Sequence, residues 1–314
     1  MTGSGTYWGL VETAAREHPD RVILADDFGR SLTNAELHSA ALHTAAALAG
    51  RGVSTGTVVS WQLPTTLEAM VVMVALARLG AVQNPILPIW RESEVGFVTS
   101  QLATEVLIVP GVWRGFDHVV LADDLARERA MGIEVVDHAE PIADGLRLPV
   151  GDPETLLAPP ASAEEARWVY YSSGTTAAPK GVRHCDRSVI AGSAGVVGMV
   201  GASSADVNPI AFPVTHIGGA AMLAASLLTG MRLVLFDTFD PARTRKRSPI
   251  TGPLCWDRLP RSSWPTWLPS ASTAPIRCSA TFVAASVAEH RSPPNWGDRC
   301  ARRCRCRESR TRGA

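Results

Sequence analysis

Cysteine is nearly missing from most of this 314-residue chain. Only Cys185 of the six cysteines lies before residue 245. That scarcity excludes a disulfide scaffold for the first 244 residues and predicts a reduced, cytoplasmic protein. The N-terminus also lacks a basic stretch followed by an apolar run, so we do not expect a signal peptide.

Long hydrophobic runs are missing as well. The most apolar stretch, residues 70–82, is too short to cross a bilayer and contains Arg78. It predicts a buried helix, and no transmembrane segment is expected. Hydrophobic residues make up 46% of the chain and charged residues 19%, which is enough for a sizeable core and argues against global disorder.

The net charge of zero conceals two unlike parts. Residues 1–244 contain 16 Lys and Arg against 26 Asp and Glu, a balance of −10. Residues 245–314 contain 14 against 4, a balance of +10. The sequence therefore predicts a domain at 1–244 and an irregular, basic tail at 245–314 that is not a native domain.

The first part alternates helical and strand-like patterns. Apolar spacing predicts helices near residues 7–18, 34–49, 65–79, 94–102, 188–200 and 220–229, and strands near 21–27, 57–64, 105–110, 167–173, 208–214 and 232–237. Thr33 and Glu36 form a candidate capping box before the second helix. This alternation predicts an α/β fold with parallel-rich sheets covered by helices on both faces.

The tail has no such periodicity, and three interpretations compete for it. Its charge fits a nucleic-acid-binding arm, although no motif supports one. A zinc site would need Cys300, Cys304 and Cys306 with either His290 or Cys278, but paired C-x-x-C units are missing. The abrupt change after Thr244 favours the third interpretation, translation in the wrong reading frame. We therefore expect no nucleic-acid partner and no metal site.

The stretch "YYSSGTTAAPKGVRH" at 170–184 has the composition of a phosphate-binding loop. The candidate ligands of the phosphates are Ser172, Ser173, Gly174, Thr175, Thr176 and Lys180. Glycine lets backbone N–H groups converge on an anion, hydroxyls add donors, and lysine adds a positive charge. The common P-loop is excluded because Pro179, not glycine, precedes the lysine. A solvated turn remains the alternative.

The same stretch resembles the phosphate-binding signature of the adenylate-forming enzymes, which include acyl-CoA synthetases, aryl-CoA ligases, luciferases and peptide-synthetase adenylation domains. It departs from that signature at Ala177, where the family usually has glycine. The opening of the chain and "GAVQNPILP" also resemble this family, and "FPVTHIGG" resembles its second motif. The resemblance covers residues 6–244 and is nearest to the fatty-acyl-CoA ligases.

The resemblance implies ATP, Mg²⁺ and CoA as cofactors and a small-molecule carboxylic acid, fatty or other, as substrate. The 172–180 loop would hold the β- and γ-phosphates, and His216 would line the acyl pocket unless it is an ordinary core or turn histidine. Two later family motifs, Tyr-Gly-x-Thr-Glu and Thr-Gly-Asp, are missing from the sequence. We therefore expect no complete catalytic set and little activity from this chain alone. The alternative is a non-catalytic remnant that binds a nucleotide or a protein partner weakly.

Overall fold

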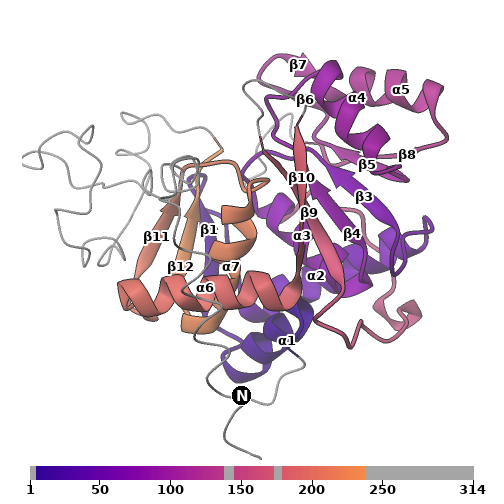
Figure 1. The fold of residues 1–314 in the computed structure, drawn as a ribbon. Helices are drawn as coiled ribbons and strands as arrows, with labels where there is room; N and C mark the ends of the chain where they lie inside the picture. The colour runs from indigo at the N-terminus through magenta and orange to yellow at the C-terminus, as the bar shows by residue number, and fades with distance from the viewer. Residues whose placement is uncertain (1–4, 138–144, 173–178, 238–314) are drawn as a thin grey trace, which may run out of the picture.

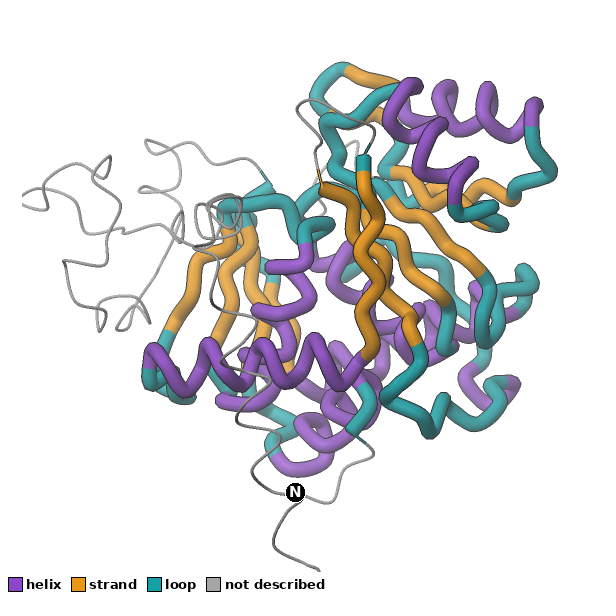
Figure 2. The backbone as a smooth tube through the Cα atoms, viewed as in Figure 1, coloured by secondary structure: helices purple, strands orange, loops and turns teal. Residues whose placement is uncertain are grey.

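The computed structural model describes residues 5–137, 145–172 and 179–237, and these contain two large β-sheets with helices between them (Figures 1 and 2). The predicted alternation of helices and strands is confirmed. The predicted α/β fold with parallel-rich sheets and covering helices is also confirmed, and its strands form two mixed sheets, here called sheet A and sheet B. The irregular tail predicted at 245–314 lies outside the described residues.

Sheet A has the strand order β11-β12-β1-β2. Its strands are β1 (Val22–Asp26), β2 (Ser31–Thr33), β11 (Val207–Ile210) and β12 (Arg232–Leu235). Strands β11, β12 and β1 are parallel, with Leu24 opposite Leu233, and β2 pairs antiparallel with β1 at the edge. Sheet A therefore joins segments that are about two hundred residues apart in sequence.

Sheet B has the strand order β10-β9-β4-β3-β5-β8. Its strands are β3 (Val58–Trp61), β4 (Val82–Pro85), β5 (Val106–Val109), β8 (Gly132–Val135), β9 (Ala166–Ser172) and β10 (Lys180–Cys185). All neighbours are parallel except β9 and β10, which form an antiparallel pair at the edge. The carboxyl ends of the parallel strands consequently face the same rim of the sheet.

Five helices pack against one another and together link the two sheets. They are α1 (Tyr7–Glu17), α2 (Asn34–Ala49), α3 (Leu67–Leu79), α6 (Asp186–Val200) and α7 (Ile217–Thr229). Every residue of α3 is buried, which confirms the predicted buried helix, and α3 contacts both β1 and β4. One continuous hydrophobic core, extending from Tyr7 to Leu235, joins these helices to both sheets.

The outer face of sheet B carries two further helices, α4 (Glu92–Gln101) and α5 (His118–Glu128) (Figure 1). Their apolar residues form a second core with Ile86, Leu107 and Val109. A small hairpin, β6 (Val112–Trp113) and β7 (Phe116–Asp117), precedes α5, and a short 3₁₀ helix, η1 (Pro153–Thr155), precedes β9. None of the helices in the described residues is long and apolar enough to cross a membrane.

Local sequence signals explain several element ends. The Thr33 side chain accepts the Glu36 N–H, and the Glu36 carboxylate accepts the Thr33 N–H, so the predicted capping box is confirmed. Gly80 and Gly230 end α3 and α7 with φ of 72° and 76°, a left-handed conformation that glycine adopts without a steric penalty.

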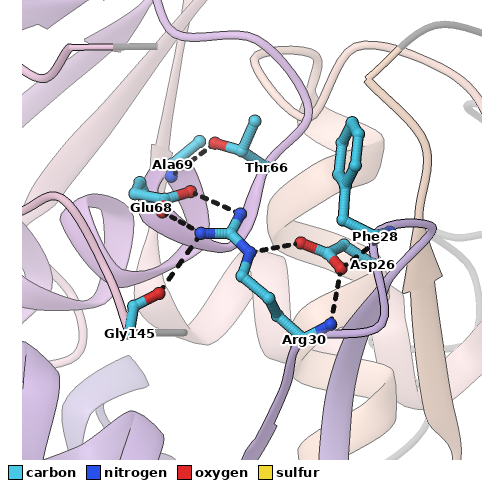
Figure 3. Close-up of polar contacts among 7 residues, drawn as sticks. All are labelled: Asp26, Phe28, Arg30, Thr66, Glu68, Ala69 and Gly145. Carbon is cyan, nitrogen blue, oxygen red and sulfur yellow. Dashed lines mark hydrogen bonds and ion pairs between the residues drawn. The ribbon is translucent and has the colours of Figure 1, made fainter. Parts of the chain in front are cut away.

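A buried ionic cluster ties sheet A to the start of α3 (Figure 3). The Arg30 guanidinium lies 2.7 Å from Asp26 at the end of β1 and 2.6 Å from Glu68 in the first turn of α3. The three side chains are 8%, 4% and 7% exposed. Burial alone would lower the pKa of Arg30, but the hydrogen bonds and charges of Glu68 and Asp26 outweigh it and raise that pKa. The cluster fixes the turn between β1 and β2 against α3.

Candidate phosphate-binding and acyl-binding site

The candidate phosphate loop is closed by the antiparallel pair of β9 and β10. Lys180 lies directly opposite Ser172 in the ladder, so the two ends of the loop are neighbours. Residues facing each other in an antiparallel pair project to the same side of a sheet. Both residues are exposed, and no hydrogen bond or ion pair joins the Lys180 side chain to another described residue. The pair thus offers a hydroxyl and an ammonium group at the mouth of the loop.

Four of the predicted phosphate ligands, Ser173, Gly174, Thr175 and Thr176, lie outside the described residues, as does Ala177. Their roles therefore stay predictions. The structure brings together only Ser172 and Lys180 from the predicted set.

The base of the hairpin is anchored in the core. The indole N–H of Trp168, which is fully buried in β9, donates to Asp186 Oδ1 at 2.7 Å. The second oxygen of Asp186 accepts the backbone N–H of Tyr7 at 2.9 Å. Burial raises the pKa of Asp186, although both hydrogen bonds act in the opposite direction. Asp186 therefore links the start of α6, the start of α1 and the strand that delivers the loop.

Tyr171 is a supporting residue that sequence reasoning missed. Its hydroxyl donates to the Gln101 side chain of α4 at 2.6 Å. Its ring lies across Gly181, where an added Cβ atom would approach the ring to 3.0 Å. A glycine directly after Lys180 thus leaves room for the ring. The only sequence feature that could have pointed to Tyr171 is the pair of adjacent tyrosines at 170–171.

The second predicted site residue, His216, is the N-cap of α7. Its Nδ1 accepts the N–H of Gly218 at 3.2 Å, so in the neutral ring the proton resides on Nε2. The residue is partly buried, and burial lowers the pKa of its imidazole. The preceding strand β11 and the glycines of α7 set this position. His216 serves as a turn residue, and its Nε2–H has no hydrogen-bond partner among the described residues.

The structure places the loop and His216 on different halves of the fold. Ser172 and Lys180 belong to sheet B, whereas His216 follows β11 of sheet A. Both sites follow the carboxyl end of a parallel strand. Ligands of open α/β sheets bind in crevices outside these ends. Ser172 and His216 therefore each lie beyond a strand end of the kind at which such ligands bind.

Comparison with known proteins identifies the family. The family model for the AMP-binding enzyme matches residues 11–251. The chain belongs to this family. It is 29% identical over 241 residues to the medium-chain fatty-acid–CoA ligase of Escherichia coli K12, covering 75% of this chain and 42% of that protein. It is 32% identical over 186 residues to the salicyl-AMP ligase of Mycobacterium tuberculosis, covering 55% of this chain and 33% of that protein.

Solved structures show the same fold. A fatty acyl CoA synthetase of Mycobacterium tuberculosis superposes with a TM-score of 0.65 at 20% identity, over 77% of this chain and 47% of that one. The o-succinylbenzoate CoA synthetase of Bacillus subtilis gives a TM-score of 0.62 at 20% identity, over 76% of this chain and 58% of that one. The chain spans less than half the length of the two curated relatives above.

Proposed function

We propose that this chain contains the phosphate-binding and acyl-binding part of an ATP-dependent carboxylate–CoA ligase. In the proposed reaction a carboxylate oxygen attacks the α-phosphorus of ATP and pyrophosphate leaves. The thiol of CoA then attacks the acyl carbon of the resulting acyl-adenylate, and AMP leaves. Membership of the AMP-binding enzyme family and similarity to a medium-chain fatty-acid–CoA ligase support this proposal.

One structural observation carries the proposal, namely the pairing of Ser172 with Lys180 at the mouth of the loop. The Lys180 ammonium would neutralise the β- and γ-phosphates, and the Ser172 hydroxyl would donate to a phosphate oxygen. Ser173, Gly174, Thr175 and Thr176 would complete the loop with further hydroxyl and N–H donors. Because the hairpin is anchored through Trp168, Ser172 and Lys180 are held in place before the nucleotide binds.

His216 would meet the carboxylic acid. The Nε2–H of the neutral ring can donate to a carboxylate oxygen, and the bond from Gly218 fixes the ring tautomer. Burial keeps the ring neutral at physiological pH, because it lowers the pKa of His216. This residue would therefore orient the nucleophile without adding a fixed charge.

Magnesium would enter this site with the triphosphate. Within the described part of the chain no three Asp, Glu, His or Cys side chains cluster as a metal site. The Ser172 hydroxyl alone does not form a magnesium site, so no step above depends on a protein-bound metal.

We further propose that residues 1–244 are the family domain, that 245–314 are not native to it, and that the 314-residue chain has little or no ligase activity by itself. The motifs expected to bind adenine, ribose and magnesium are missing from its sequence. The coding DNA tests the tail: an alternative frame after Thr244 should encode these motifs. We place the protein in the cytoplasm, because the proposed domain contains a single cysteine.

Two measurements test the proposed function. ATP and inorganic tripolyphosphate should raise the melting temperature of the purified chain, because a ligand that binds only the folded state stabilises it. Decanoyl-CoA formation from decanoate, ATP and CoA should stay near background. Robust turnover would contradict the proposed inactivity, and no stabilisation by either ligand would contradict the phosphate site. Stabilisation by ATP without turnover in any longer form of the protein would favour the non-catalytic binder.

A further inference from the structure

Thr65 connects two segments that are distant in sequence. It lies between β3 and α3 and is 5% exposed. Its hydroxyl donates to the carbonyl of Phe212 at 3.0 Å and accepts the N–H of Val214 at 3.3 Å. One side chain thus satisfies two backbone groups on either side of Pro213. Serine and threonine can do this because a hydroxyl both donates and accepts.

The segment that Thr65 holds is the one that leads into His216. The His216 N–H donates to the Pro213 carbonyl at 3.0 Å. Val214 packs so closely on α7 that a Cβ atom added to Gly219 would lie 2.0 Å from the Val214 carbonyl oxygen. Residues 212–216 are therefore fixed to α7 on one side and to Thr65 on the other.

The two partners belong to different sheets. Thr65 follows β3, which joins the loop hairpin through β4 and β9 of sheet B. Residues 212–216 follow β11 of sheet A. Three residues after Thr65, Glu68 forms the ion pair with Arg30 that ties the end of β1 to the same turn of α3. The start of α3 is therefore a joint at which both sheets are fastened.

We propose that Thr65 is a positioning residue that sets the His216 segment relative to Ser172 and Lys180. Its role rests on the proposed function, in which a carboxylate at His216 and a triphosphate at Ser172 and Lys180 must meet at a fixed separation. A shift of about 1 Å between reacting groups can cost about a hundredfold in rate, so two hydrogen bonds at this joint have a direct effect on the site. No other side chain in the described residues bonds to the backbone on both sides of Pro213.

The test compares Thr65→Val, which keeps the shape and loses the hydroxyl, with Thr65→Ser, which keeps the hydroxyl. Thr99→Val is the matched control, because Thr99 is also buried but its hydroxyl bonds mainly within α4. The ring signals of His216, assigned with His216→Gln, are followed by NMR in the 314-residue chain. Calorimetry gives the affinities for decanoate and for inorganic tripolyphosphate.

We expect Thr65→Val to shift the His216 signals and to weaken decanoate binding about tenfold, the effect of losing a hydrogen bond worth about 1.4 kcal/mol. Tripolyphosphate affinity should stay within about twofold, and Thr65→Ser and Thr99→Val should match the wild type. If Thr65→Val fails to fold, Thr65→Cys replaces it, because a thiol is a weak donor of similar size.

The proposal is overturned if Thr65→Val has wild-type His216 signals and wild-type decanoate affinity. It is also overturned if Thr65→Ser loses as much decanoate affinity as Thr65→Val. If the wild-type chain binds neither probe, the proposed function fails while Thr65 is still judged on the His216 signals. Shifted signals that serine restores would then support its positioning role, and unshifted signals would overturn it.

Discussion

Ser172 and Lys180 face each other across the antiparallel ladder of β9 and β10. The hairpin thereby places the first hydroxyl and the lysine of the candidate loop side by side, although eight positions separate them in sequence. A flexible loop of this length would hold its lysine at many distances from its first serine. The ladder removes most of that freedom, which lowers the entropy lost when an anion binds.

Replacing Lys180 with alanine should weaken binding of ATP and of tripolyphosphate about ten- to a hundredfold. A charge-assisted bond to phosphate contributes about 1.5–3 kcal/mol. Arg183→Ala is the control, because Arg183 is an exposed cation on the same strand whose side chain points to the other face. Calorimetric titration measures the affinity of both variants for ATP and for tripolyphosphate. Equal losses in the two variants would show that overall charge, not the loop, attracts the ligand.

Replacing Arg30 with methionine should lower the free energy of unfolding by about 3–5 kcal/mol. The substitution leaves the buried carboxylates of Asp26 and Glu68 without their counter-ion. Arg16→Met, which removes an exposed pair with Glu17, should cost less than about 1 kcal/mol. Urea unfolding of the two variants gives the comparison, and a small effect at Arg30 would mean that the cluster is hydrated.

Gly219→Ala and Gly195→Ala should have opposite effects. A Cβ atom at Gly219 would collide with the Val214 carbonyl, whereas one at Gly195 meets nothing within 4 Å. We expect Gly219→Ala to cost about 1–3 kcal/mol of stability or more. Alanine at Gly195, in the exposed face of α6, should add about 0.5–1 kcal/mol. Thermal melts of both variants test this pair, and a stable Gly219→Ala protein would contradict the close packing of residues 212–216 on α7.

Acidification should destabilise the protein between about pH 7 and pH 5.5. Burial lowers the pKa of His118 below its usual 6.5, and the nearby Arg91 acts in the same direction, although carbonyls of Pro88 and Phe116 oppose it. Within this window the unfolded chain binds more protons than the folded chain, so the free energy of unfolding falls as the pH falls. Burial also lowers the pKa of His38, His184 and His216, so their protonation destabilises the folded chain in the same direction.

Urea unfolding at several pH values checks this expectation. His118→Gln should show a shallower dependence than the wild type, whatever its absolute stability. The raised pKa of Asp186 acts in the other direction, adding stability as the pH falls toward its usual 3.8. Stability that is flat or rising between pH 7 and pH 5.5 would show that the histidines are not held neutral.

Local signals in the sequence were enough for most elements near the site. The hydrophobic periodicity of α3, the Thr33–Glu36 cap and the glycine end of α7 each depend on a few neighbouring residues, and each prediction is confirmed. The β9–β10 pairing was missed, because the exposed residues of β10 carry no alternating apolar pattern. Strand pairing there depends on β9 and on the core beneath it.

Long-range contacts could not be predicted from the sequence alone. The bonds of Thr65 to residues 212–214 and of Arg30 to Glu68 join positions 147 and 38 residues apart. No spacing rule links such positions. The contacts that fasten both sheets to the start of α3 could therefore be identified only from the structure. The assignment of Ser173, Gly174, Thr175 and Thr176 to phosphates stays a prediction from the motif.

The pairing of β1 with β12 has a consequence for synthesis on the ribosome. The strands β3, β4, β5 and β8 of sheet B are all translated by residue 135, whereas β1 must wait for residues 232–235 before it gains its parallel neighbour. During that interval β1, with the fully buried Ile23 and Leu24, can pair only with the short edge strand β2. Non-local pairing of this kind folds slowly and leaves apolar strands exposed. We therefore expect nascent chains stalled before residue 232 to depend on chaperones, and release of that dependence once β12 has emerged.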